Sequence, residues 1–477
     1  MLFNSLEFLI FLPLVLLVYY RLSHQNQNRF LVVASCYFYA SWDWRFLAPL
    51  IFSTTIDFYC ARQMERSIEA GGLQSERKRY LVLSLITNLG LLAFFKYFNF
   101  FVDSFHDVLA GLGVDVPVPA LNVILPVGIS FYTFQALSYT IDVYRGQVHA
   151  VRSFWDFFLA VLFFPHLVAG PIQRAANLLK QVMTPRRTTP EQWQDGIHLI
   201  IWGYFKKVFI ADGLAPIANA IFAANSPTGG EVVVGVLAFA FQIYCDFSGY
   251  TDIARGVAKL MGFEFMLNFN LPYLARNPPD FWQRWHISLS TWLRDYLYIS
   301  LGGNRGSRTQ TYRNLMVTML IGGLWHGAAW NYVLWGAYHG FILVIHRLVV
   351  SPLRSVERAF GHLAHSLWVT LCVICMFTLT CYGWLLFRAT GLTQIGAMTA
   401  SLLHSGLAGL PTNLAWTVLL FASPLVVVQA LQWSQGRLDF MRQKWLPLPA
   451  MVAVYAVMGY LILFRGGAPQ AFVYFQF

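Results

Sequence analysis

Residues Met316–His339 read MVTMLIGGLWHGAAWNYVLWGAYH, an apolar stretch that contains His326 and His339. An imidazole is costly to place in hydrocarbon, so an ionisable residue in such a stretch indicates a functional site. Histidine is also the side chain best suited to taking up and returning a proton near neutral pH. A lone histidine is more often a packed residue that donates to a backbone carbonyl. The Trp-His-Gly context of His326, and a second histidine in a Trp-rich segment upstream, favour function.

The composition around this stretch is that of a membrane protein. The 477 residues are 57% hydrophobic, 17% aromatic and 12% charged, and the mean hydropathy is +0.53. A soluble domain carries roughly 25% charged residues. The apolar runs are continuous and do not alternate, which favours helices over a barrel. The first 22 residues lack a basic N-terminal region and a small-residue cleavage site, so we expect a retained first helix.

The positive charge is explained by membrane topology. The net charge is +11, from 33 Lys and Arg against 22 Asp and Glu. The basic residues gather in particular loops, whereas Asp103–Asn122, Asp212–Glu231 and Thr390–Asn413 contain no Lys or Arg. By the positive-inside rule the basic loops face the cytoplasm and the loops without Lys or Arg face outside. We expect no nucleic-acid partner.

The apolar runs predict an all-α polytopic protein with about 11–12 membrane helices, each needing roughly 20 residues to cross as a straight helix. An even count places both termini outside. Phe30–Ala40 and the Pro-interrupted Phe154–Leu167 are short, and are expected to be re-entrant or buried. No internal repeat or low-complexity linker is present, which predicts a single domain over residues 1–477. The six cysteines complete no zinc site, so no metal is expected.

The segment Phe281–Leu297, FWQRWHISLSTWLRDYL, has large aromatic and apolar residues, among them Trp285, at the spacing of one helix with an aromatic face. An interfacial amphipathic helix would explain its Trp and Arg residues. That interpretation does not call for His286, or for the polar Ser288 that follows it.

A second polar segment is Gln242–Gly256, QIYCDFSGYTDIARG. It holds closely spaced polar residues directly after an apolar run: Asp246, Ser248, Tyr250 and Asp252. Carboxylates near membrane depth usually pair with a cation or line a water-filled path. Alternatively, Asp246 or Ser248 caps a helix that runs through Ile253–Leu260. Both interpretations stay open.

Two further segments are less specific. Phe164–Arg174, FPHLVAGPIQR, places His166 between a Pro and a Gly-Pro break, which suits a re-entrant loop. The C-terminal Ala471–Phe477, AFVYFQF, has large apolar or aromatic residues at five of its seven positions, and Tyr474 carries its only hydroxyl. The alternative for this tail is packing at the outer interface.

Together the motifs resemble the membrane-bound O-acyltransferase family, in particular its bacterial branch that O-acetylates alginate, cellulose or peptidoglycan. The matching stretches, in order, are Leu125–Gly146, Phe163–Arg174, Tyr244–Gly256, Phe281–Ser307 and Ile321–Gly340. The resemblance implies a ring of tilted helices with re-entrant or interfacial helices around a central tunnel, in the bacterial inner membrane. It also implies that His326 is catalytic and that His286 lies towards the cytoplasmic entrance for the acyl donor. Eukaryotic members often carry Asn at the position of His286.

The chemistry can be argued from the residues as well. Acyl transfer from a thioester to an alcohol needs a base for the hydroxyl and stabilisation of the oxyanion. Burial beside Trp325 and Trp330 should keep His326 neutral, as a base must be. The other residues predicted to support the tunnel are Asp246, Ser248, Tyr250, Asp252, Trp285, Ser288, Trp325 and Asn331. We interpret His339 as structural.

The tail also resembles that of a small accessory protein of lipoteichoic-acid D-alanylation, which implies that Tyr474 is an acyl relay. The implied donor is acetyl-CoA or an acyl-carrier-protein thioester in the cytoplasm, with no permanently bound cofactor. The implied partners are periplasmic acetyltransferases of the SGNH or AlgX-like type and a polysaccharide acceptor. The predicted function is O-acetylation of an extracytoplasmic polysaccharide. The alternatives are D-alanyl transfer from a carrier protein to teichoic acid, a transporter without catalysis, and a scaffold that recruits secreted acetyltransferases.

Overall fold

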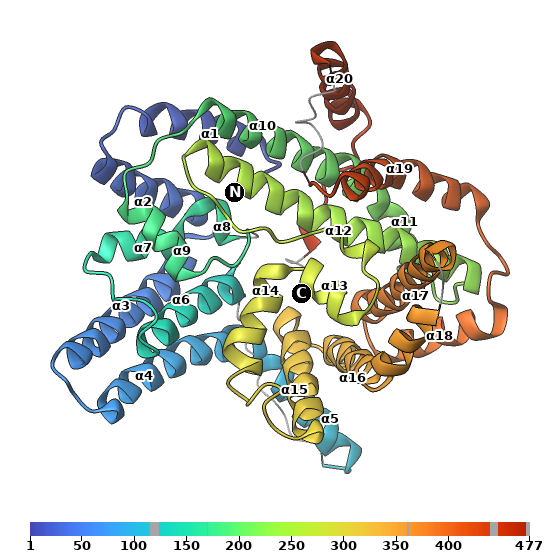
Figure 1. The fold of residues 1–477 in the computed structure, drawn as a ribbon, viewed down its shortest axis with the longest axis horizontal. Coiled ribbons are helices and arrows are strands. Elements are labelled where there is room, and N and C mark those ends of the chain that lie inside the picture. The colour runs from blue at the N-terminus through green and yellow to red at the C-terminus, as the bar shows by residue number, and fades with distance from the viewer. Residues whose placement is uncertain (115–123, 169, 360–361, 439–446, 474–477) are drawn as a thin grey trace. The chain divides into compact units, whose positions relative to one another are not determined.

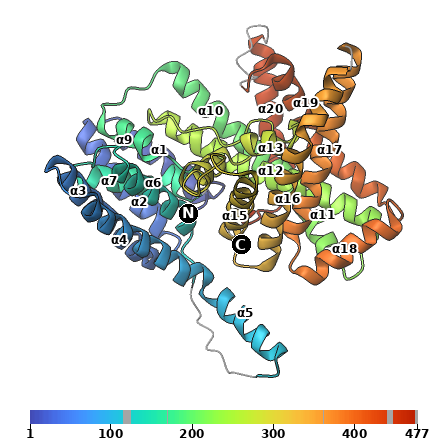
Figure 2. The same ribbon diagram turned by 60° about the horizontal axis from the view of Figure 1, so that its bottom comes forward.

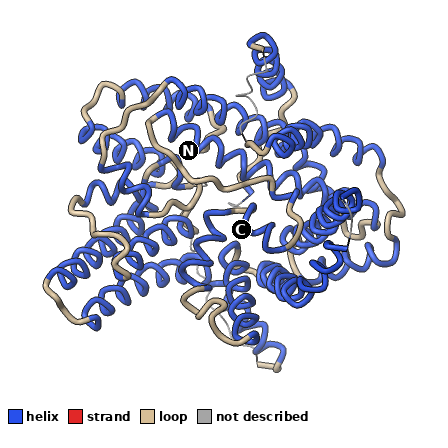
Figure 3. Tube along the Cα trace, viewed as in Figure 1, coloured by secondary structure: helices blue, strands red, loops and turns tan. Residues whose placement is uncertain are grey.

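The apolar runs fold as helices, and no strand occurs among the described residues (Figure 3). The computed structural model describes residues 1–114, 124–168, 170–359, 362–438 and 447–473. Its internal contacts divide the chain into two compact units (Figure 1). Unit 1 comprises Met1–Ile197 with Ala254–Met266, and unit 2 comprises His198–Ile253 with Leu267–Phe477. The single-domain interpretation stays a prediction.

Unit 1 is built around α3, α4 and α6, which pack on one another. Its helices are α1 (Leu6–Tyr19), α2 (His24–Ala40), α3 (Leu47–Glu69), α4 (Gln74–Leu92), α5 (Phe98–Gly111), α6 (Ile129–Tyr144), α7 (Phe154–Leu162), α8 (Phe164–Leu167), α9 (Ala175–Met183) and the first half of α10 (Pro190–Tyr204). A π-helical turn, Ala93–Tyr97, joins α4 to α5, and Figure 2 shows α5 extending beyond α4.

A buried polar cluster, the Asp57 cluster, joins α3, α4 and α6. Asp57 accepts hydrogen bonds from Ser84 Oγ at 2.6 Å and from Asn88 Nδ2 at 2.8 Å. Ser84 Oγ also lies 3.0 Å from Thr140 Oγ1. Asp57 is completely buried, at 0% exposure. Neutral donors from the same unit therefore satisfy this acid.

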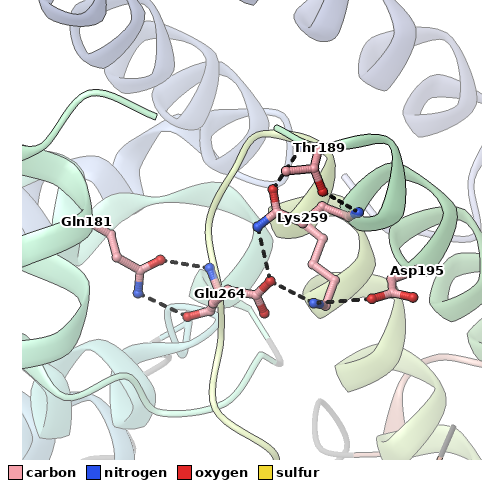
Figure 4. A network of polar contacts seen from close by, with 6 residues as sticks. Gln181, Thr189, Asp195, Lys259 and Glu264 are labelled. Carbon is pink, nitrogen blue, oxygen red and sulfur yellow. Dashed lines mark hydrogen bonds and ion pairs between the residues drawn. The ribbon is translucent and has the colours of Figure 1, made fainter. Parts of the chain in front are cut away.

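The chain leaves α12 through a loop that an exposed polar network holds in unit 1 (Figure 4). The Gln181 amide accepts from Glu264 N–H at 2.7 Å and donates to Glu264 C=O at 3.0 Å. Lys259 Nζ donates to the Glu264 carboxylate at 2.7 Å and lies 3.9 Å from Asp195. Exposed ion pairs of this kind contribute little, about 0–1 kcal/mol.

Unit 2 contains the segments from which the sequence predicted the catalytic histidines, Phe281–Leu297 and Ile321–Gly340. Its elements are the π-helix η3 (Phe205–Ala211), α11 (Asp212–Ala223), α12 (Gly229–Leu260, whose last turns belong to unit 1), α13 (Pro278–Arg284), α14 (Ile287–Trp292), the π-helix η5 (Leu293–Tyr298), α15 (Arg308–His326), α16 (Trp330–Ala359), α17 (His362–Arg388), α18 (Leu392–Ser405), α19 (Thr412–Gln435) and α20 (Leu448–Phe464).

Several helices have the length and composition of membrane spans. Within the described part of the chain these are Gln74–Gly111, Gly229–Leu260, Trp330–Val350, His365–Arg388 and Thr412–Gln435. The apolar helices α1 and α20 are shorter. The all-α polytopic class is confirmed.

The remaining apolar runs form shorter or interrupted helices. Phe154–Leu167 folds as α7 and α8, separated by a break at Phe163, and most of it is buried, as expected for a run too short to cross. The count of about 11–12 crossings exceeds the helices long enough to span unaided, which need roughly 20 residues. The ring and its tunnel stay predictions.

Candidate active site

His326 is the last residue of α15, at the turn into α16. Its side chain is buried, with 4% of the residue exposed. The imidazole centroid lies 5.0 Å from the Trp325 ring, 5.0 Å from the Trp335 ring and 5.4 Å from the Phe387 ring. The aromatic rings exclude water from a side chain that is able to exchange a proton.

The α15–α16 hairpin is closely packed because two glycines face each other. A Cβ on Gly323 would meet the Tyr332 carbonyl oxygen at 2.2 Å, and one on Gly336 would meet a backbone oxygen of α15 at 2.4 Å. Small residues allow two helices to approach this closely. This approach brings Trp335 of α16 against the end of α15.

His286 lies between two short helices. Helix α13 ends at Arg284 and α14 begins at Ile287, so the predicted single helix over Phe281–Leu297 is wrong. His286 has φ 43° and ψ 53°, in the left-handed region that non-glycine residues rarely adopt. Backbone strain of this kind occurs preferentially at functional sites.

A side chain distant in the sequence stabilises this break. Asn268 accepts from Ser288 N–H at 3.2 Å and from Ser288 Oγ at 2.9 Å through its side-chain oxygen. Its backbone oxygen accepts from Ile287 N–H at 2.9 Å. Asn268 thus satisfies the free N–H groups at the start of α14, in the way an N-cap residue does. Ser288 supports the backbone at His286, and the sequence analysis missed Asn268.

The break brings the two histidines together. The centroids of His286 and His326 are 6.3 Å apart, and Trp325 contacts both rings, at 5.8 Å and 5.0 Å. Phe247 of α12 lies edge-on to His286 at 4.7 Å. Burial lowers the pKa of His286 to about 3, so its imidazole is neutral. We call these four residues the histidine site.

Asp246 and Asp252 both lie within α12, which is continuous from Gly229 to Leu260. The capping interpretation is therefore wrong, because neither Asp246 nor Ser248 stands at a helix end. Asp246 pairs instead with Lys207 at 2.8 Å, and Asp252 with Lys206 at 2.7 Å. The other interpretation was that these carboxylates pair with a cation or line a water-filled path; the cation pairs are observed, and the water-filled path stays a prediction. Ser248 accepts from Lys206 Nζ at 2.9 Å.

The sequence analysis missed the two lysines. They follow a close crossing of α10 and α12, where a Cβ on Gly203 would meet the Gly249 oxygen at 2.6 Å. The crossing holds η3 against α12, and both lysines are buried there, at 3% and 1% exposure. The sequence could have revealed these lysines, because both lie inside the apolar run 196–210, where charged residues are costly.

Phe472 and Val473, the last two residues that the structure describes, are buried at 0% and 2% exposure, whereas Ala471 is exposed. Packing of the tail at the outer interface stays an open alternative. The Phe472 ring lies 4.4 Å from Tyr250 and 5.8 Å from Phe247. Tyr474 and the remainder of the predicted tail motif lie outside the described residues.

Two predicted support residues have neighbours of their own. Trp285 is fully buried and its ring centroid lies 4.7 Å from that of Trp384, in an aromatic core beside the site. Asn331 donates to the backbone oxygens of Phe387 at 3.2 Å and Ala389 at 2.9 Å. It therefore holds the C-terminal end of α17, which contains Phe387, by hydrogen bonds.

Two other histidines that the sequence pointed to, His339 and His166, are packed side chains. His339 lies 5.2 Å from the Trp282 ring and 4.7 Å from the Trp335 ring, and is 1% exposed. His166 is buried in unit 1, 5.5 Å from the Phe265 ring. Among the described residues no group of three or more His, Cys, Asp or Glu side chains is placed to hold a metal ion.

Comparison with known proteins identifies the family of the chain. Residues 150–387 match the sequence model of the membrane-bound O-acyltransferase family. The chain is 44% identical to the probable alginate O-acetylase AlgI of Azotobacter vinelandii over 408 residues, which are 85% of this chain and 79% of that relative. It is 31% identical to the peptidoglycan O-acetyltransferase of Helicobacter pylori, over 100% of this chain and 98% of the relative.

A third relative is more distant. The teichoic acid D-alanyltransferase of Bacillus subtilis is 29% identical over 56% of this chain and 70% of its own length. The family match contains both His286 and His326. The chain is thus an acyltransferase embedded in the membrane by several helices, and it belongs to the membrane-bound O-acyltransferase family.

Proposed function

We propose that this protein transfers an acetyl group from a cytoplasmic thioester across the membrane for O-acetylation of an extracytoplasmic polysaccharide. The observation that carries the proposal is the buried pair of His286 and His326, 6.3 Å apart. Acetyl as the cargo is supported by relatives named for acetylating alginate and peptidoglycan.

The reaction follows from the chemistry of a buried imidazole. His326 takes the proton of a hydroxyl group while that oxygen attacks the thioester carbonyl carbon. The carbon–sulfur bond then breaks, and the imidazolium returns the proton to the leaving thiolate. Both changes of charge occur among Trp325, Trp335 and Phe387, where electrostatic interactions are stronger than in water.

The donor is acetyl-CoA or an acyl-carrier-protein thioester, and His286 faces its approach. In this scheme the first acceptor is the phenol of Tyr474, which relays the acetyl group to a periplasmic acetyltransferase partner of the SGNH type. The burial of Phe472 and Val473, which directly precede Tyr474, supports the relay. The protein would lie in the bacterial inner membrane with both termini extracytoplasmic.

The test is His326→Ala with His339→Phe as a matched control, since both histidines are buried and both contact Trp335. Loss of a general base typically costs about 10²–10⁴ in rate. We expect polymer acetylation to fall by at least about 100-fold in His326→Ala at unchanged membrane abundance, and to persist in the control. Near-normal acetylation in His326→Ala would exclude this residue as the base.

D-alanyl transfer is supported by the Bacillus subtilis relative, which is similar over a smaller share of the chain. Binding of acetyl-CoA to the purified protein, compared with binding of a D-alanyl carrier protein, separates the two cargoes. For His286→Ala we expect a weaker, donor-dependent defect than for His326→Ala. An equal defect with every donor would argue against a role at the donor entrance.

A further inference from the structure

Lys207 lies at the centre of a buried ionic cluster in unit 2. Its ammonium lies 2.8 Å from Asp212 Oδ1 and 2.8 Å from Asp246 Oδ1. It also donates to the Gln470 carbonyl oxygen at 3.0 Å. An ammonium group has three N–H donors. Two of them face the carboxylates, and the third donates to the backbone of the C-terminal tail. We call Lys207, Asp212 and Asp246 the Lys207 cluster.

The tail makes a second bond to the same cluster. Val473 N–H donates to Asp246 Oδ2 at 2.6 Å, on the side of the carboxylate that Lys207 does not occupy. Asp246 is 0% exposed, and a buried carboxylate is strongly disfavoured unless its oxygens accept hydrogen bonds. The tail therefore supplies both an acceptor for Lys207 and a donor for Asp246.

The tail enters through a position that only glycine fits. Gly467 N–H donates to the Val208 carbonyl oxygen at 3.1 Å. A Cβ on Gly467 would meet backbone atoms of Asp212 at 2.2 Å. Every third residue of the tail, at 467, 470 and 473, thus makes a backbone contact with η3 or α12. These contacts fix the position of the tail through its backbone atoms, so they do not depend on the side chains of these three residues.

One side chain of the tail sets the register. Phe472 is completely buried against Tyr250 and Phe247. Phe247 in turn contacts His286 at 4.7 Å between centroids. The docked tail therefore contacts the histidine site through Phe247 and is separated from His286 by that one ring.

We propose that the Lys207 cluster is the docking site of the C-terminal tail, and that Lys207 and Asp246 are positioning residues for the segment that carries Tyr474. Docking itself follows from the contacts of residues 467–473. The positioning role rests on the proposed relay, because it matters to catalysis only if Tyr474 accepts the acyl group.

The sharpest test removes one N–H. Val473→Pro deletes the donor to Asp246 and leaves Tyr474 in place. Val473→Thr is the matched control, since it keeps the N–H and the shape of the side chain. Asp246→Asn is the second variant, because it removes the charge of the acceptor with little change in volume. Hydrogen exchange of the C-terminal peptide, measured by mass spectrometry on the purified full-length protein, reports docking, and the α15–α16 peptides report an intact fold.

We expect the tail peptide to exchange about tenfold faster or more in Val473→Pro and Asp246→Asn, since a hydrogen bond to a charged group typically carries at least that factor. The α15–α16 peptides and Val473→Thr should match the unchanged protein. Tail protection that survives in both Val473→Pro and Asp246→Asn would overturn the docking site. Equal loss of protection in Val473→Thr would also overturn it, because the N–H would then be irrelevant.

Polymer acetylation in the same variants separates docking from relay. If the tail undocks and acetylation falls with it, the positioning role is supported. If the tail undocks while acetylation stays normal, docking stands and the positioning role, together with the Tyr474 relay, fails. If acetylation falls in Val473→Pro while the tail stays protected, the docking proposal fails although the relay can still hold.

Discussion

The two units each bury an aspartate, and they satisfy it in different ways. Asp57 in unit 1 accepts from neutral donors, Ser84 and Asn88, which both belong to α4, a helix packed directly on its own. Asp246 in unit 2 pairs with Lys207 and accepts from Val473 N–H at the end of the chain. The first cluster is complete without the tail, whereas the second needs the tail for full satisfaction.

The difference shows what each arrangement is suited to. The donors of Asp57 lie in a helix packed on its own, so that cluster forms whether or not the tail is present. An acid beside a lysine binds strongly to a backbone N–H, because hydrogen bonds to charged groups are stronger than those between neutral groups. The Asp57 cluster is therefore expected to depend on Ser84 and Asn88, and the Lys207 cluster to depend on the tail.

Removing the cation should produce the largest effect. Lys207→Met leaves two buried carboxylates, Asp212 and Asp246, without their shared partner. Breaking a buried pair in this way typically costs about 3–5 kcal/mol. We expect a large fall in thermal stability in detergent, while Lys259→Met, which breaks the exposed pair with Glu264, should change it by about 0–1 kcal/mol. Equal shifts in the two variants would show that the Lys207 cluster contributes no more than a surface pair.

Asp57→Leu should lower thermal stability by an intermediate amount. The change leaves the buried donors of Ser84 and Asn88 without the carboxylate that accepts from them. A buried donor left unsatisfied typically costs about 1–3 kcal/mol. We expect the melting temperature in detergent to fall by less than in Lys207→Met and by more than in Ser84→Ala. An unchanged melting temperature would show that the Asp57 cluster does not stabilise the fold.

Ser84→Ala should have the smallest effect on stability, about 1 kcal/mol for one hydrogen bond. Ser53→Ala is the control, since the buried Ser53 hydroxyl donates to the Leu50 carbonyl oxygen in the same helix as Asp57. In an Asp57→Leu background the effect of Ser84→Ala should shrink, while that of Ser53→Ala should persist. An equal effect of Ser84→Ala in both backgrounds would remove Ser84 from the account.

The sequence predicted the histidine site because its signal is local. A histidine inside an apolar run is unusual enough to single out His326, and the ordered motifs add His286. The contacts that shape the site are not local. Asn268 caps α14 from outside the Trp-rich segment, and no periodicity within that segment reveals the break. Helical spacing therefore predicted one helix where there are two.

The polar segment of α12 shows the same limit. Asp246 and Ser248 have the composition of a helix start, and only the fold shows that α12 continues through them. Their partner lysines were visible in the sequence as charges within an apolar run, but pairing them required the close crossing at Gly203 and Gly249. The fold class was predictable from composition, whereas the ionic partners depended on which helices cross.

The left-handed backbone at His286 also limits how this position can vary among relatives. Asparagine and glycine adopt that conformation readily, whereas valine, isoleucine and threonine do so at a substantial cost. Asparagine is also the residue that the family resemblance places here in eukaryotic members. The backbone conformation by itself is therefore compatible with either His or Asn at this position. A His286→Asn exchange is therefore expected to preserve the turn between α13 and α14 and to change only the group that this turn presents.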